Sequence, residues 1–103
     1  MLDKEMAINI AEKFTEAVIK EFPPYAIIVF GSYINGNPHE NSDIDVGVVF
    51  NGFTGDRRLA TSRLWRLRRG IRLDIEPHLL DFANDQSGFV KYIYNTGQII
   101  YQN

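Results

Sequence analysis

The chain has 103 residues, of which 45% are hydrophobic and 23% are charged, as expected for one small globular domain. It contains no cysteine and only two histidines, which excludes a disulfide framework and argues against a zinc site. The first residues lack the basic start and apolar run of a signal peptide, and no segment has the length of a transmembrane helix. We therefore expect a single domain over residues 1–103, located in the cytoplasm and without a membrane partner.

The net charge of −2 hides an uneven distribution, because all seven arginines lie between Arg57 and Arg72. A solvated helix face is the simpler interpretation of this cluster, and contact with phosphate or a partner is the alternative. The chain is not basic overall and shows no interleaving of aromatic and basic residues, so we do not expect nucleic acid as a partner.

The first half of the chain predicts a helix, a strand and a loop. Residues 3–21 have apolar side chains at every fourth position, and Asp3 is suited to cap this helix. Residues 25–30 form a continuous apolar run, typical of a strand buried on both faces. Residues 31–41 are rich in turn-forming residues and predict a loop with a short helical turn after Ser32.

The second half predicts a strand at 45–50, a helix at 56–69, a strand at 71–76, a helix at 88–95 and a strand at 98–101. The helix at 56–69 is expected to turn four apolar side chains inward: Leu59, Ala60, Leu64 and Leu67. The expected fold class is α/β (α+β), with a small mixed sheet flanked by helices.

The most informative feature lies at the end of the first strand. Gly31 and Ser32 follow it directly, and Asp43 and Asp45 come about ten residues later. A glycine allows a phosphate to approach the backbone, and Ser32 can offer both an amide and a hydroxyl. Two aspartates at i and i+2 of a strand share a face, and Mg²⁺ relieves the repulsion between such carboxylates. The pattern predicts a site for Mg²⁺ and a nucleotide.

A site with two metal ions needs a third carboxylate from a neighbouring strand. Asp74 and Glu76 are the candidates, because they lie two residues apart on the strand predicted at 71–76. We favour Asp74, which lies deeper in that predicted strand, and keep Glu76 as the alternative. His39 and His78 are interpreted as ordinary polar residues.

These residues carry a resemblance to a known family. Gly31-Ser32 followed by Asp43-x-Asp45 and a later acidic strand resembles the DNA polymerase β-type nucleotidyltransferase superfamily, and the small size resembles its minimal, MntA-like antitoxin branch. The resemblance implies a nucleotidyltransferase fold, two Mg²⁺ ions, and transfer of a nucleoside monophosphate, usually AMP from ATP, to a hydroxyl. It assigns triphosphate binding to Gly31 and Ser32, and catalysis and metal binding to Asp43, Asp45 and Asp74.

The resemblance also implies a partner. Small members of this family often pair with a helical HEPN-domain protein, and the antitoxin group attaches AMP to a tyrosine of that toxin. Two other functions remain open. The chain could be a binding module that neutralises its partner by occlusion, or it could nucleotidylate a small molecule such as an aminoglycoside at a site formed by a homo-oligomer.

Overall fold

The computed structural model describes residues 2–39 and 42–103 of the chain. The helices are α1 (Lys4–Ile19), α2 (Ser32–Asn35), α3 (Arg57–Arg68) and α4 (Phe89–Thr96), with a short 3-10 helix, η1 (Phe82–Asn84). The strands are β1 (Ala26–Phe30), β2 (Ile44–Phe50), β3 (Ile75–Asp81) and β4 (Gln98–Gln102). Within the described ranges, no helix is long and apolar enough to cross a lipid bilayer.

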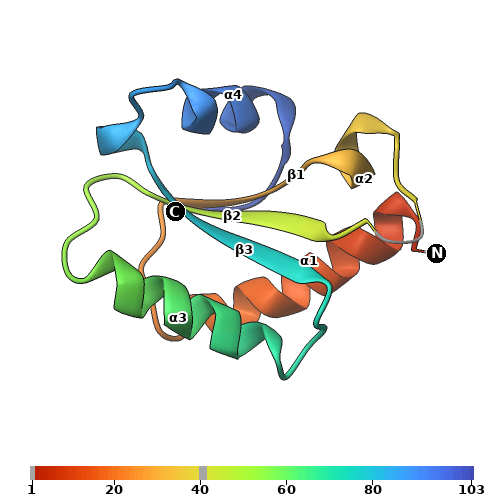
Figure 1. Ribbon diagram of the computed structural model, residues 1–103, viewed down its shortest axis with the longest axis horizontal. Helices are drawn as coiled ribbons and strands as arrows, with labels where there is room; N and C mark the ends of the chain where they lie inside the picture. The colour runs from red at the N-terminus through yellow and green to blue at the C-terminus, as the bar shows by residue number, and fades with distance from the viewer. Residues whose placement is uncertain (1, 40–41) are drawn as a thin grey trace.

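The four strands form one mixed sheet in the order β3-β2-β1-β4. β1 runs antiparallel to both β2 and β4, whereas β2 and β3 are parallel. Helices α1 and α3 lie on one side of the sheet and α4 on the other (Figure 1). The mixed sheet flanked by helices that the sequence predicted is confirmed.

Alternation along the strands builds a separate core on each face. Side chains such as Ile27, Val29 and Val46 pack with α1 and α3 in the larger core. Ile28 and Val49 face the opposite way and pack with buried residues of α4. Each residue of β2 is therefore assigned to one face, and Asp45 belongs to the face that carries α4.

Local signals explain several element boundaries. Asp3 caps α1 by accepting a hydrogen bond of 2.8 Å from the backbone N–H of Met6, as predicted. At the far end of β3, the buried Asp81 carboxylate accepts three backbone N–H bonds of 2.8–2.9 Å, from Gly52, Phe53 and Ala83. These bonds attach the chain that follows β2 to the end of β3.

Two expectations about the second half are wrong. The strand predicted at 71–76 is a turn as far as Asp74, and β3 begins at Ile75. The Arg68 guanidinium donates to the carbonyls of Leu73 and Ile75 and stabilises this turn. In addition, Leu59 points outward, with 65% of its surface exposed, whereas Ala60 and Leu64 are buried as predicted.

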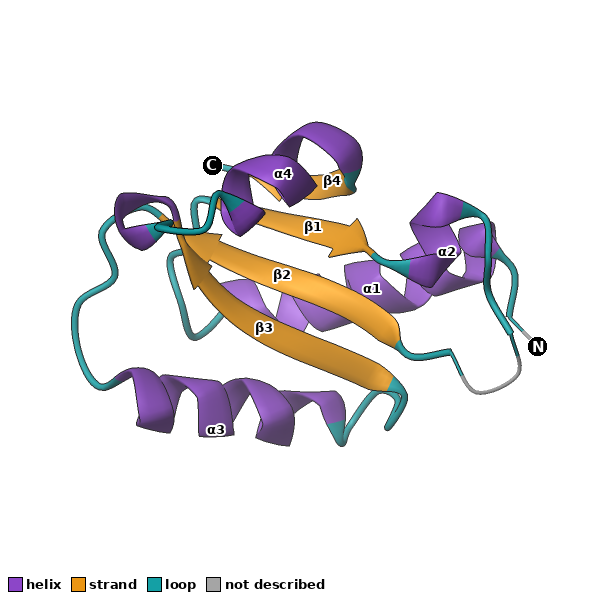
Figure 2. Cartoon of the chain, turned by 45° about the horizontal axis from the view of Figure 1, so that its top comes forward, coloured by secondary structure: helices purple, strands orange, loops and turns teal. Residues whose placement is uncertain are grey.

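β3 continues through Pro77, although proline lacks an N–H and usually ends a strand. Figure 2 shows β3 as the outer strand beside β2. An edge strand tolerates proline, since one row of its N–H groups has no partner strand.

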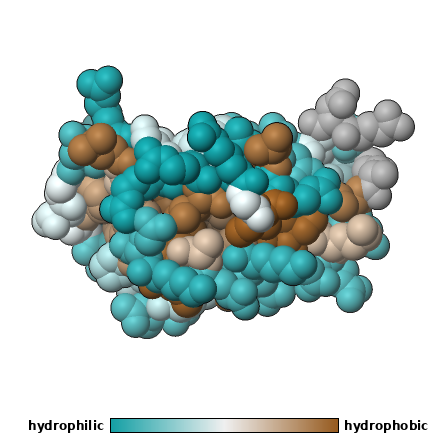
Figure 3. Space-filling model, turned by 90° about the horizontal axis from the view of Figure 1, so that it is seen from below, coloured by the Kyte–Doolittle hydropathy of each residue, from teal (hydrophilic) through white to brown (hydrophobic). Residues whose placement is uncertain are grey.

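The face formed by α1 and α3 is mostly hydrophilic, with hydrophobic side chains gathered in a band between polar rows (Figure 3). Large hydrophobic side chains of these two helices that remain exposed are Met6, Ile19, Leu59 and Trp65. The Arg68 guanidinium lies over the ring of Trp65, 4.5 Å from its centroid. Trp65 is therefore a partly exposed helix residue rather than a core residue.

Candidate active site

The candidate site is built on β2 and β3, at the end of the sheet near α2. Asp45 of β2 pairs in register with Glu76 of the parallel β3. His78, two residues further along β3, points to the same face, and its Nε2 lies 3.1 Å from Asp45 Oδ1. One ligand atom from each of Asp45, Glu76 and His78 lies within 4.8 Å of the others.

The side chains of the cluster are partly exposed to solvent. α4 packs on the neighbouring part of this face, where a Cβ built on Gly47 would lie 3.1 Å from Ile93. Asp45 lies two residues before Gly47, and its side chain remains 23% exposed. The His78 side chain is 31% exposed. The cluster is therefore partly buried and still reachable by a ligand.

Gly31 closes one side of the cluster. A Cβ built on it would lie 2.4 Å from Asp45 Oδ2, far inside van der Waals contact. Its backbone, with φ 83° and ψ −152°, also lies in a region that essentially only glycine adopts. Glycine is required here for two independent reasons, and the Asp45 carboxylate lies directly against the start of α2.

The two carboxylates of the cluster repel each other. Burial raises the pKa of Glu76, and the negative charge of Asp45 raises it further. His78 acts in the opposite direction by favouring the ionised form of Glu76, and a hydrogen bond with Asp45 again raises the pKa. A cation bound between these side chains would relieve the repulsion.

Asp43 and Ser32 flank the cluster. Asp43 precedes β2, is exposed, and is near enough for its charge to contribute to the raised pKa of Glu76. Ser32 is half-buried in the first turn of α2. Both therefore lie on the side of the site where the chain leaves β1 and enters β2.

Asp74 is placed differently from the sequence expectation. It precedes β3, so it does not share a strand face with Glu76. Its carboxylate forms a two-point ion pair with Arg72, with Nη2 2.8 Å from Oδ2 and Nε 3.2 Å from Oδ1. Burial and then the charge of Asp74 raise the pKa of the neighbouring Tyr33. Glu76, and not Asp74, is the acidic residue grouped with Asp45.

The structure adds His78 to the candidate cluster, whereas the sequence interpretation treats it as an ordinary polar residue. Its ring packs against Phe30, the β1 partner of Asp45, with centroids 5.1 Å apart. The signal was present in the alternation of Glu76, His78 and Leu80, which share one face of β3. Pro77 obscures this alternation in the sequence, because proline usually ends a strand.

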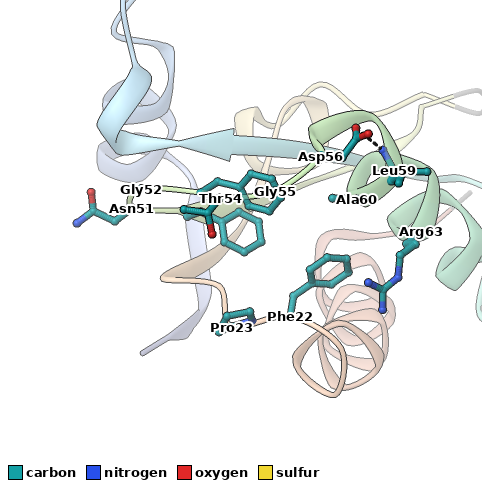
Figure 4. Close-up of a pocket in the computed structure, with 12 residues that line it drawn as sticks. Phe22, Pro23, Asn51, Gly52, Thr54, Gly55, Asp56, Leu59, Ala60 and Arg63 are labelled. Carbon is teal, nitrogen blue, oxygen red and sulfur yellow. Dashed lines mark hydrogen bonds between the residues drawn. The ribbon is translucent and has the colours of Figure 1, made fainter.

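Of two cavities in the described structure, one lies next to the cluster and the other lies away from it. A cavity of about 210 Å³ lies between α2 and α4, and Phe30, Gly31, Ile34, Phe89 and Tyr92 are among its lining residues. It shares Gly31 with the site. A second cavity, of about 500 Å³, lies at the opposite end of β2, where Phe22, Asp56, Leu59 and Arg63 surround it (Figure 4). The second cavity contains none of the predicted site residues.

Solved structures share this fold. A candidate nucleotidyltransferase from Sulfolobus solfataricus has 22% identity and a TM-score of 0.69, with 97% of this chain and 84% of that chain covered. A chain of a toxin–antitoxin complex with AMP-PNP has 26% identity and a TM-score of 0.67, covering 89% and 73% of the two chains.

A third structure contains tri-AMPylated HEPN toxin from Shewanella oneidensis in complex with MNT antitoxin. It has 22% identity and a TM-score of 0.64, covering 95% of this chain and 74% of that one.

The family comparison agrees with the fold. No curated protein sequence gives a significant match. Residues 12–103, however, match the family described as "Polymerase beta, Nucleotidyltransferase", which spans all four strands and the whole candidate site. The chain is a nucleotidyltransferase that belongs to this polymerase β-type family.

Proposed function

We propose that this chain transfers AMP from ATP to the hydroxyl group of a tyrosine in a HEPN-type toxin partner, with release of pyrophosphate, in a reaction that depends on Mg²⁺. The observation that carries the proposal is the convergence of Asp45, Glu76 and His78 against Gly31. The AMP-PNP complex and the AMPylated HEPN toxin among structures of the same fold support the choice of nucleotide and acceptor.

The donor set fits divalent cations. Asp43 and Asp45 would hold one ion together with the triphosphate, and Asp45 would share a second ion with Glu76. Ions held in this way supply positive charge to the attacking and leaving oxygens of a phosphoryl displacement. This assignment makes Glu76 the third carboxylate, because the Asp74 carboxylate is paired with Arg72.

The remaining residues would position the reactants. Gly31 and Ser32 would bind the triphosphate, since the absence of a side chain at Gly31 allows close approach to the backbone. The cavity between α2 and α4 has an apolar and aromatic lining suited to the adenine base. Glu76, which lies beside Asp45 in the cluster, would accept the proton of the tyrosine hydroxyl.

Label transfer from ATP tests the reaction. The chain is incubated with a purified HEPN-domain toxin and ATP labelled at the α-phosphate or at the γ-phosphate. The proposal expects transfer of the α-label alone to the toxin, and loss of transfer in Asp45→Asn and Glu76→Gln. Asp74→Asn is the matched control, and it should retain most of the transfer.

The same assay separates catalysis from occlusion. Absence of α-label transfer by the wild type, or equal transfer by Asp45→Asn, would contradict the proposal. If Asp45→Asn neutralises the toxin as fully as the wild type does, without labelling it, neutralisation occurs by occlusion and not by AMP transfer.

A further inference from the structure

The cluster contains a nitrogen donor where a magnesium site would have oxygen alone. His78 lies on the same face of β3 as Glu76, and its Nε2 is directed at Asp45 Oδ1 at 3.1 Å. Mg²⁺ strongly prefers oxygen ligands, whereas imidazole suits transition-metal ions. The composition of the cluster therefore bears on which ion the site selects.

The separations within the cluster suit a coordination sphere. Two ligand atoms at right angles, each about 2.1 Å from an ion, lie about 3 Å apart. The 3.1 Å between His78 Nε2 and Asp45 Oδ1 matches such an edge. Glu76 offers the third donor, a carboxylate oxygen that lies within 4.8 Å of the other two donor atoms.

The surroundings fix the orientation of the imidazole. The Phe30 ring packs against that of His78, with centroids 5.1 Å apart, and a second aromatic ring, Phe89, packs on Phe30 at 5.6 Å. Packing of this kind orders the metal-ligating side chain before the ion binds, so less conformational entropy is lost on binding. Asp45 is held in turn by its place in the sheet and by contact with Gly31.

We infer that His78 is a metal ligand, and that the position formed by Asp45, Glu76 and His78 takes a divalent transition ion such as Mn²⁺ in preference to Mg²⁺. The inference rests on the proposed function, because it assumes the two metal positions described there. The second position, formed by Asp43, Asp45 and the triphosphate, still takes Mg²⁺. The enzyme thus carries two unlike metal positions that share Asp45. In this arrangement, His78 sets the metal preference of the site.

Electron paramagnetic resonance of Mn²⁺ tests the inference directly. The purified protein is titrated with Mn²⁺, alone and with a non-hydrolysable ATP analogue, and ¹⁴N coupling to the bound ion is measured by pulsed methods. We expect ¹⁴N coupling in the wild type, its loss in His78→Asp with Mn²⁺ still bound, and its retention in His39→Gln, which removes the other histidine. Competition with Mg²⁺ should show that His78→Asp lowers the preference for Mn²⁺ about tenfold.

The outcomes separate this inference from the function beneath it. Bound Mn²⁺ without ¹⁴N coupling, or coupling that persists in His78→Asp, would overturn the role of His78 and leave the nucleotidyltransferase site intact. Absence of Mn²⁺ binding even with the ATP analogue would overturn both the ligand assignment and the proposed metal-dependent reaction.

Discussion

Replacement of Gly31 by alanine tests whether the start of α2 and the Asp45 carboxylate form one unit. The backbone at Gly31 lies in a region that costs alanine about 1–3 kcal/mol. The new Cβ would also lie 2.4 Å from Asp45 Oδ2, so the carboxylate must move by about 1 Å to reach ordinary contact. With about 1 kcal/mol for this displacement, we expect Gly31→Ala to lower the free energy of unfolding by about 2–4 kcal/mol.

Gly36 supplies a matched control for this substitution. It has a similar φ of 85°, but a Cβ built there would meet nothing within 4 Å. Gly36→Ala should therefore lower the free energy of unfolding by only about 1–2 kcal/mol, which is the cost of a left-handed backbone for alanine. Urea unfolding followed by circular dichroism measures both values, and Mn²⁺ titration measures the site. Equal destabilisation by the two variants, or unchanged Mn²⁺ affinity in Gly31→Ala, would refute the reasoning.

Two further predictions concern the support of the sheet. Burial opposes ionisation of Asp81, but its three backbone hydrogen bonds and Arg57 outweigh burial and lower its pKa. Its stabilising contribution should therefore be complete above the unfolded carboxyl pKa of about 3.9 and disappear as the pH falls through the lower folded value. Asp81→Asn should lower the free energy of unfolding, measured with urea, by about 2–3 kcal/mol at pH 7 and by less at pH 3. An equal loss at both pH values would contradict a stabilising role for the ionised Asp81 carboxylate. Gly97→Ala should lower the free energy of unfolding by about 1–3 kcal/mol in the same assay, because its Cβ would lie 2.6 Å from Ile28 Cγ2 and 2.7 Å from the Ile93 carbonyl oxygen. Gly70→Ala is the control and should have little effect, because the nearest atom to its Cβ would be 4.0 Å away.

Much of the fold follows from local patterns in the sequence. The cap at Asp3, the buried run of β1 and the helical turn after Ser32 each depend on short-range preferences, and the structure has all three. The mixed sheet also follows from the order of helices and strands. These features could be predicted because neighbouring residues suffice to determine them.

The third strand could not be predicted in the same way. Residues 71–74 alternate between apolar and charged as a strand does, yet they form a turn. The Arg68 guanidinium stabilises this turn by donating hydrogen bonds to the carbonyl oxygens of Leu73 and Ile75. Pro77 is acceptable only because β3 lies at the sheet edge, which is a property of the assembled sheet. A strand that begins at residue 71 would place Asp74 deeper than Glu76, whereas β3 begins at Ile75 and leaves Asp74 outside the strand.

The site shows the same division between local and long-range information. Gly31, Asp43 and Asp45 are separated by short, informative spacings, and the structure places Gly31 against Asp45. The neighbours of Asp45 on β3, in contrast, depend on the register of two parallel strands that α3 separates in the chain. No local pattern gives that register, so the sequence alone could not predict that His78 lies beside Asp45.

Calorimetric titration with a non-hydrolysable ATP analogue is the most direct test of a metal-dependent nucleotide site. The wild type is titrated with Mg²⁺, with Mn²⁺ and with EDTA, beside Asp45→Asn and the control Asp74→Asn. The expected result is binding that requires a divalent ion, disappears with EDTA and in Asp45→Asn, and persists in Asp74→Asn. Binding that is unchanged by EDTA or by Asp45→Asn would contradict it.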